Sequence, residues 1–188
     1  MFCFGTIEQR DARSRETLRA LLEEGGFKRV FLDLNLRPPF YDKEVVEYSL
    51  RHCDIVKLNL DEAAVLREMF NFPEGNTEEF AADLRSRFAI DQILLTAGSV
   101  GAYYANAEGF GFRSAYRVTV SDPVGAGDAF SAGLLHCLLD VGGELESACD
   151  FGCRLGALIA SKCSSLPVYA LAELDDLQIA GDHGDTKP

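Results

Sequence analysis

The amino-acid sequence predicts an α/β fold in which helices flank a mainly parallel β-sheet. Short apolar runs that suit buried strands, at Val30–Leu34, Asp54–Leu58 and Gln92–Thr96, alternate with longer segments whose apolar residues recur at helical spacing. This alternation is typical of βαβ units, which build parallel sheets with helices on both faces. The chain has 188 residues, 47% hydrophobic and 26% charged, so it can bury a sizeable core as one globular domain.

The other elements follow from capping residues, chain breakers and apolar periodicity. The expected helices are one capped by Ser14 and ended by Gly25-Gly26, then Asp42–Arg51, Leu60–Phe70, Thr77–Phe88, Ala126–Leu139 and Leu145–Lys162. The other strand signals are the apolar run Phe2–Phe4, a hairpin of Tyr103–Ala105 with Phe110–Phe112, and a β-like run at Tyr116–Val120. Right-handed crossovers would bring the carboxyl ends of the parallel strands to one edge, where ligands bind in such sheets.

Composition and charge exclude several classes of protein. The formal net charge is −12 and no basic run is present, which argues against a nucleic-acid partner. No stretch reaches the ~18–20 apolar residues of a membrane span, and the three histidines form no metal-ligand pattern. The six cysteines include no CxxC pair, so we expect buried free thiols in a reducing cytoplasm, with Cys149 and Cys153 on one helical face.

The segment Ser121–Phe130, with the sequence SDPVGAGDAF, carries the clearest chemical signal. Gly125 and Gly127 lack a Cβ, so the turn can bring backbone N–H groups close to an anion, and the helix that follows adds its positive N-terminal end. Asp128 in the first helical turn could accept a proton from a hydroxyl brought to a bound phosphate, which is what an alcohol phosphotransferase requires. From spacing alone, the alternative is that Asp128 caps the helix and the glycines only make a turn.

This segment closely resembles the C-terminal signature of PfkB-family (ribokinase-like) carbohydrate kinases, with Pro123 in place of the family's usual Thr. Three further segments resemble family motifs in the family's order: D-x-N-x-R at 33–37, K-x-N-x-x-E at 57–62 and T-x-G-x-x-G at 96–101. Each lies where a predicted strand ends. The chain has no G-x-x-x-x-G-K-[ST] motif, so it is not a P-loop NTPase.

The resemblance implies roles for individual residues. It implies that Asp128 is the general base and that Gly125, Ala126 and Gly127 bind the phosphate. It also places Asn35 and Arg37 near substrate or phosphate. Asn59 and Glu62 would hold Mg²⁺ through water, although by themselves they could be a helix cap and an exposed helical carboxylate. The resemblance also implies contacts with the nucleotide, made by Asn59, Glu62, Thr96, Gly98, Gly101, Cys153 and Ala157.

The last predicted helix and its surroundings carry two further implications. Gly156 and its small neighbours could mean only close helix packing, whereas the resemblance makes this helix a wall of the adenine pocket. The resemblance offers Asp122 as a ligand for a monovalent cation such as K⁺. Typical members carry a Gly-Ala pair near the cation loop, and here that slot holds Ser164-Ser165, a departure that bears on cation activation.

The resemblance runs from about Phe2 to Pro167 and lacks the family's N-terminal strands, β lid and most sugar contacts. We therefore assign residues 1–170 to the C-terminal part of a PfkB carbohydrate kinase domain and 171–188 to a polar, acidic tail that frays from Glu173. The implied activity is transfer of phosphate from ATP, with Mg²⁺, to a small sugar, most similar to fructokinases through Phe4-Gly5 and the stretch 35–39. Alternatives are a ribokinase-like or nucleoside kinase, and an inactive nucleotide-binding fragment. Alone, the chain is expected to bind nucleotide weakly, to show little activity, and to self-associate through the Phe2–Phe4 edge.

Overall fold

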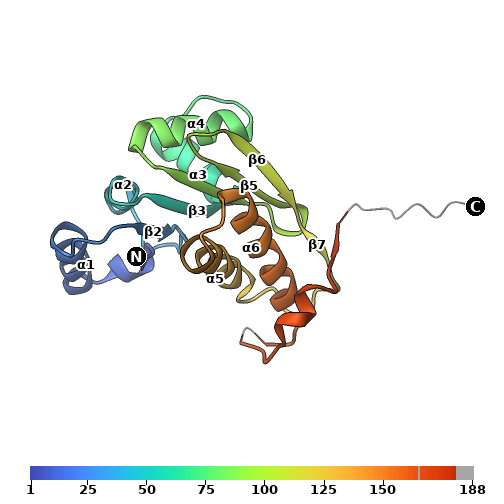
Figure 1. The fold of residues 1–188 in the computed structure, drawn as a ribbon. Helices are drawn as coiled ribbons and strands as arrows, with labels where there is room; N and C mark the ends of the chain where they lie inside the picture. The colour runs from blue at the N-terminus through green and yellow to red at the C-terminus, as the bar shows by residue number, and fades with distance from the viewer. Residues whose placement is uncertain (165, 181–188) are drawn as a thin grey trace, which may run out of the picture. The chain divides into compact units, whose positions relative to one another are not determined.

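The structure, a computed structural model, describes residues 1–164 and 166–180 as two compact units (Figure 1). The first unit comprises Met1–Thr96 and Ala105–Phe110, and the second comprises Ala97–Tyr104 and the described residues from Gly111 onward. The predicted α/β class with a mainly parallel sheet is confirmed. Within the described residues, no helix is long and apolar enough to cross a membrane.

The first unit is built on four parallel strands in sequence order. They are β1 (Phe2–Phe4), β2 (Val30–Asp33), β3 (Ile55–Asn59) and β4 (Gln92–Thr96), with β1 on β2, β2 on β3 and β3 on β4. Ile55, Val56, Leu58 and the middle of β4 are fully buried, which explains why these strands read as continuous apolar runs.

The helices of the first unit follow their strands, as βαβ connections require. They are η1 (Ile7–Arg10), α1 (Ala12–Glu24), α2 (Lys43–Arg51), α3 (Leu60–Phe70) and α4 (Thr77–Phe88). The predicted bounds of α3, α4 and β4 are confirmed. For the two helices the reason is local, because Asn59 and Asn76 each form a capping box that fixes the helix start. The prediction that Ser14 caps the first helix was wrong. Asp11 caps α1 by accepting the N–H groups of Arg13 and Ser14 at 3.0 and 3.2 Å.

The second unit combines short strands with two long helices that pack side by side (Figure 1). Its elements are η2 (Gly98–Val100), β5 (Gly101–Ala105), β6 (Phe110–Ser114), β7 (Tyr116–Arg117), α5 (Ala126–His136), η3 (Cys137–Val141), α6 (Leu145–Ala160), η4 (Leu171–Leu174) and β8 (Gln178–Ile179). β5 and β6 are neighbours, as the hairpin prediction requires, and β7 pairs antiparallel with β8.

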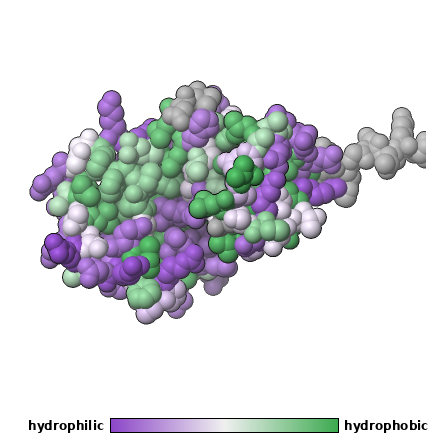
Figure 2. All heavy atoms as spheres, turned by 90° about the horizontal axis from the view of Figure 1, so that it is seen from below, coloured by the Kyte–Doolittle hydropathy of each residue, from purple (hydrophilic) through white to green (hydrophobic). Residues whose placement is uncertain are grey.

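On the face drawn in Figure 2, apolar side chains form a broad area on the side away from the C-terminal tail.

Three expectations for this region are corrected. The β-like run ends at Arg117, since Val120 is 56% exposed and lies outside the sheet. The helix from Ala126 continues as a π-helical turn, η3, rather than as α-helix. The tail does not fray from Glu173: Leu174 is buried against α6, and β8 pairs with β7. Residues 181–188 lie outside the described residues.

Candidate active site

The carboxyl ends of β2, β3 and β4 bring the first group of predicted site residues together. In the β2–β3 register Asp33 lies beside Lys57, and in the β3–β4 register Asn59 lies beside Thr96. Neighbouring strands lie about 4.8 Å apart, so these residues form one polar edge. Parallel sheets bind ligands at this edge.

Asp33 and Lys57 form an ion pair that the sequence did not reveal. The Lys57 ammonium lies 3.1 and 3.0 Å from the two carboxylate oxygens of Asp33, and Lys57 is only 9% exposed. A lysine is almost never this buried unless it is paired. The sequence feature that could have predicted this ion pair is the presence of opposite charges at the ends of two neighbouring apolar strands.

Glu62 links the start of α3 to the loop that follows β2. One of its carboxylate oxygens accepts the Leu36 N–H and the other accepts the Asn59 N–H, both at 2.8 Å. The Asn59 side chain accepts the Glu62 N–H at 2.8 Å in return. Burial raises the pKa of Glu62 above the ordinary carboxyl range, against the lowering effect of these backbone hydrogen bonds.

The loop after β2 is held from both sides. Its backbone reaches a left-handed conformation at Asn35, with φ of 41°, a region that asparagine tolerates better than most residues. The buried Thr6 hydroxyl donates to the Leu34 carbonyl at 2.9 Å, while Glu62 holds Leu36 from the other side. Arg37 follows in this loop and is exposed.

The second unit contains the loop that precedes α5. The Ser121 and Asp122 N–H groups both donate to the Ala160 carbonyl, at 2.9 and 3.2 Å, which ties this loop to the end of α6. Asp122 in turn accepts the Val124 N–H at 2.9 Å. The loop therefore has a defined conformation before it reaches the glycines.

The start of α5 presents backbone N–H groups that have no partner within the helix. Gly125 is the N-cap with φ of 85°, a conformation that favours glycine. The Ala126 N–H already donates to the Pro123 carbonyl at 3.2 Å, so the first-turn N–H groups of Gly127 and Asp128 are the ones that α5 itself cannot satisfy. Gly127 and Asp128 are both exposed at this end of the helix.

In the predicted turn after β4, the structure explains why the second glycine, Gly101, is required. Gly101 has φ of 142°, and a Cβ there would clash with the Arg113 carbonyl oxygen. The Ala97 N–H donates to the Gly101 carbonyl at 2.8 Å, which closes the turn. Gly98, with φ of 57°, is exposed and has open space where a Cβ would be.

Helix α6 contains a glycine that allows close helix packing and two residues that the sequence predicts to contact the nucleotide. A Cβ on Gly156 would come within 3.1 Å of the Ala126 carbonyl, so this glycine lets α6 approach the start of α5 closely. Cys153 is buried and Ala157 half-buried. A hydrogen bond with Cys153 and burial raise the pKa of Cys149, as expected for two inert thiols on one helical face.

The cysteine and metal expectations have mixed outcomes. All six cysteines are free, but only Cys53, Cys149 and Cys153 are buried, while Cys3 and Cys163 are exposed, so the expectation of uniformly buried thiols was wrong. The described residues contain no group of three or more His, Cys, Asp or Glu side chains that could hold a metal ion. Ser164 is exposed, and Ser165 lies outside the described residues.

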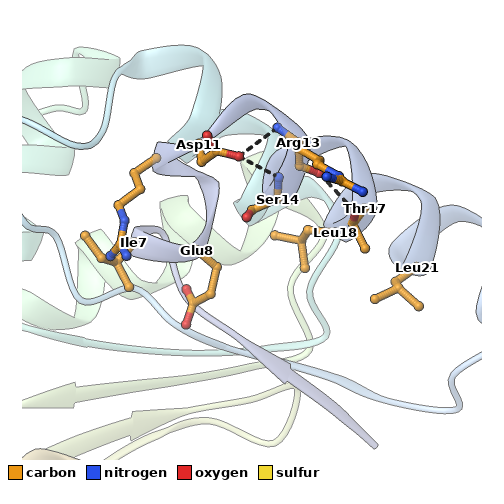
Figure 3. Close-up of a pocket in the computed structure, with 9 residues that line it drawn as sticks. Ile7, Glu8, Asp11, Arg13, Ser14, Thr17, Leu18 and Leu21 are labelled. Atoms are coloured by element: carbon orange, nitrogen blue, oxygen red, sulfur yellow. Dashed lines mark hydrogen bonds between the residues drawn. The ribbon is translucent and has the colours of Figure 1, made fainter.

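A groove of about 630 Å³ lies elsewhere in the first unit, along η1 and α1 (Figure 3). Its lining combines apolar, hydroxyl and charged side chains and includes none of the predicted site residues. The lining residues are Ile7, Glu8, Arg10, Asp11, Arg13, Ser14, Thr17, Leu18 and Leu21.

Sequence comparison connects these features to known proteins. Residues 8–167 match the pfkB family carbohydrate kinases. The chain is 30% identical over 151 residues to the 5-dehydro-2-deoxygluconokinase of Bacillus subtilis, covering 77% of this chain and 45% of that protein. It is 32% identical over 146 residues to the aminoimidazole riboside kinase of Salmonella typhimurium, covering 73% and 43%.

Structural comparison gives the same result. The aminoimidazole riboside kinase of Salmonella enterica, solved with aminoimidazole riboside and an ATP analogue, is similar with a TM-score of 0.70 and 28% identity, over 93% of this chain and 61% of that one. A fructokinase from Vibrio cholerae O395 shares the fold, with a TM-score of 0.78, 24% identity and coverage of 93% and 58%. The chain thus spans somewhat less than half of the curated relatives' length.

Proposed function

The chain belongs to the pfkB family of carbohydrate kinases, and from this premise we propose that its residues carry out phosphoryl transfer from ATP to a sugar hydroxyl. The observation that carries the proposal is the start of α5. There, a left-handed Gly125 precedes first-turn N–H groups that can hold phosphate oxygens, and an exposed carboxylate, Asp128, belongs to the same turn.

In this proposal Asp128 acts as the general base. The sugar oxygen attacks the γ-phosphorus, the bond from the γ-phosphorus to the bridging oxygen breaks, and ADP leaves with that oxygen. The hydroxyl proton passes to the Asp128 carboxylate. The N–H groups of Gly127 and Asp128 stabilise negative charge on the transferring group, because they are fixed in direction before the reaction begins.

Asn59 and Glu62 suit Mg²⁺ held through water rather than by direct contact. Both Glu62 oxygens already accept a backbone N–H, and the residue is 8% exposed, so its remaining acceptor capacity suits a water molecule. Bound Mg²⁺ would neutralise charge on the phosphates of ATP. Glu62→Gln should raise the Mg²⁺ concentration at half-maximal rate by a larger factor than it changes the sugar KM, whereas the opposite pattern would place Glu62 in the sugar site.

Thr96, Gly98, Gly101, Cys153 and Ala157 are proposed to contact the nucleotide, and Asn35 and Arg37 the substrate or its phosphate. Asp122 is a proposed K⁺ ligand, although one of its carboxylate oxygens already accepts the Val124 N–H. The sugar class is proposed as fructose-like, from Phe4-Gly5 and residues 35–39. Relatives named for 5-dehydro-2-deoxygluconate, aminoimidazole riboside and fructose match over similar shares of the chain, so the assay must include several acceptors.

The test is sugar-dependent ADP release by purified protein, with fructose, ribose and adenosine as acceptors. Calorimetric titration with Mg-ATP is run in parallel, and Asp128→Asn serves as the control for each activity. ADP release that depends on a sugar and on Asp128 supports the proposal. Nucleotide binding without turnover would instead support the alternative of an inactive nucleotide-binding fragment.

A further inference from the structure

The carboxyl ends of β2 and β3 bring three charged side chains together in the first unit. Asp33 lies beside Lys57 in the β2–β3 register, and residues two apart on a strand lie on one face, so Lys57 and Asn59 share a face of the sheet. Glu62 follows in the first turn of α3 and accepts the Asn59 N–H at 2.8 Å. The three charges therefore lie where the cation site is proposed.

These charges are largely withdrawn from water. The side chains of Lys57 and Asp33 are 11% and 21% exposed, and Glu62 is 8% exposed. Both oxygens of Glu62 accept a backbone N–H, as an ionised carboxylate does. Water and salt screen such buried charges poorly, so each charge acts strongly on the others.

Lys57 acts on both carboxylates. Its ammonium lies 3.1 and 3.0 Å from the two oxygens of Asp33. Burial raises the pKa of Glu62, and of the two nearby charges that of Lys57 lowers this pKa while that of Asp33 raises it. Two carboxylates and one ammonium leave a single net negative charge in this group.

We propose that Lys57 is the counter-ion of the cation site proposed at Asn59 and Glu62, and that its ammonium keeps the affinity of this site for a lone divalent cation low. The inference rests on the proposed function, which supplies the site. Proteins usually bind Mg²⁺ through one or two carboxylates together with phosphates of the substrate. With Lys57 in place, Mg²⁺ binding would depend on the phosphates of the nucleotide, whose negative charge offsets the ammonium. Lys57 acts through the two carboxylates, so it is a positioning residue.

Mn²⁺ binding to the purified chain without nucleotide tests this role directly. The measurement is the electron paramagnetic resonance signal of unbound Mn²⁺ at pH 7. Lys57→Gln removes the positive charge and should bind Mn²⁺ at least ~10-fold more tightly than the wild type. Lys28→Gln, at an exposed lysine of the same unit, is the control and should leave the affinity unchanged. Equal affinities of Lys57→Gln and the wild type, including no measurable binding by either, would overturn the proposal.

A double variant separates the charge of Lys57 from its packing. Asp33→Asn combined with Lys57→Gln removes the ion pair but restores the net charge of the wild type. Its Mn²⁺ affinity should therefore fall back from that of Lys57→Gln towards the wild-type value. A double variant that binds Mn²⁺ as tightly as Lys57→Gln would show that charge does not set the affinity, and would overturn the proposal.

Thermal unfolding gives a readout that does not depend on enzymatic activity. Lys57→Gln leaves two buried carboxylates without their counter-ion and should unfold at a lower temperature than the double variant. Mn²⁺ should raise the unfolding temperature of Lys57→Gln more than that of the wild type, because a ligand that binds the folded state stabilises it. If Lys57→Gln does not fold without metal, recovery of its circular dichroism spectrum on adding Mn²⁺ supports the proposal, and no recovery overturns it.

Glu62 separates this inference from the function on which it rests. Adding Glu62→Gln to Lys57→Gln should weaken Mn²⁺ binding ~10–100-fold. Binding that is independent of Glu62 would overturn the cation site itself. Binding that needs Glu62 but is equally tight with and without Lys57 would overturn only the counter-ion role, and sugar-dependent ADP release tests phosphoryl transfer independently of both.

Discussion

Glu62 offers a quantitative test of how the loop after β2 is held. It occupies the third position of the α3 capping box, where Glu79 stands in α4, and each follows an asparagine cap. The two glutamates differ in one respect that matters. Glu62 is buried and accepts a second backbone N–H from Leu36, whereas Glu79 is exposed and accepts the N–H of its own cap, Asn76.

Glu62→Gln should destabilise the protein more than Glu79→Gln. A glutamine has one side-chain oxygen, so at Glu62 it can keep only one of the two bonds and leaves a backbone N–H unsatisfied. Losing a hydrogen bond to a charged group costs about 1.5–3 kcal/mol, and the neutral amide regains part of this because it avoids the burial of a charge. We expect a net loss of about 1–2 kcal/mol. At the exposed Glu79 the loss should remain within about 0.5 kcal/mol.

Urea denaturation at pH 7 measures both changes from the shift in midpoint at constant slope. The pH dependence supplies a second check. Because burial raises the folded pKa of Glu62, its protonated form favours the folded state, and that contribution is lost as pH rises through the folded pKa. The difference between wild type and Glu62→Gln should therefore widen as pH falls from 7 towards ~4.3, the ordinary glutamate pKa. Equal destabilisation at the two sites, or a difference that narrows on acidification, would refute the proposed bracing role.

Two predictions concern the start of α5. In a catalytically active form, Asp128→Asn should lower kcat by ~10²–10⁴-fold with nucleotide affinity largely kept, and near-full kcat would remove Asp128 as the base. Gly127→Val should lower ATP affinity by calorimetry while the circular dichroism spectrum is retained, because a branched side chain would crowd the N–H groups of the first turn; unchanged affinity would count against the anion site.

Most of the first unit could be predicted from the sequence because its signals are local. The asparagine caps at 59 and 76 fix where α3 and α4 begin, and the buried strands read as apolar runs. The start of α1 was misjudged because Asp11 and Ser14 are both good caps, and sequence alone does not show which one the chain uses. In the structure Asp11 accepts two backbone N–H groups, and the helix therefore begins after Asp11.

The rest of the structure depends on contacts between residues distant in sequence. The Glu62 to Leu36 bond spans 26 residues, and the Lys57 to Asp33 pair spans 24. β8 was read as part of a fraying tail because Gln178–Ile179 is too short to show periodicity, and its order comes from pairing with β7. The candidate site was recognisable because its residues stand at strand ends and a helix start, whereas the bonds that position them span long stretches of sequence.

Tyr116 connects this long-range bonding to the loop before α5. From β7, its hydroxyl donates to Asp150 on α6 at 2.8 Å and accepts the Arg154 Nε–H at 2.8 Å. The Arg154 guanidinium also lies 5.2 Å from the centre of the Tyr116 ring. Since α6 also holds Ser121 and Asp122 through the Ala160 carbonyl, the β7–α6 contact fixes both ends of the segment that leads to Gly125.

Tyr116→Phe should therefore cost about 1–2 kcal/mol, the loss of hydrogen bonds to charged partners in a buried position. Burial raises the pKa of Tyr116, so the folded state holds this proton more tightly than the unfolded state does. The contribution is fully present below ~10, the ordinary tyrosine pKa, and is lost as pH rises through the folded pKa. Urea midpoints should give a constant difference between wild type and Tyr116→Phe from pH 7 to 9 that shrinks above pH 10. Tyr169→Phe, at a tyrosine that is 36% exposed, is the control and should show little change. A Tyr116→Phe difference that is absent, or that grows above pH 10, would mean that the hydroxyl does not brace β7 against α6.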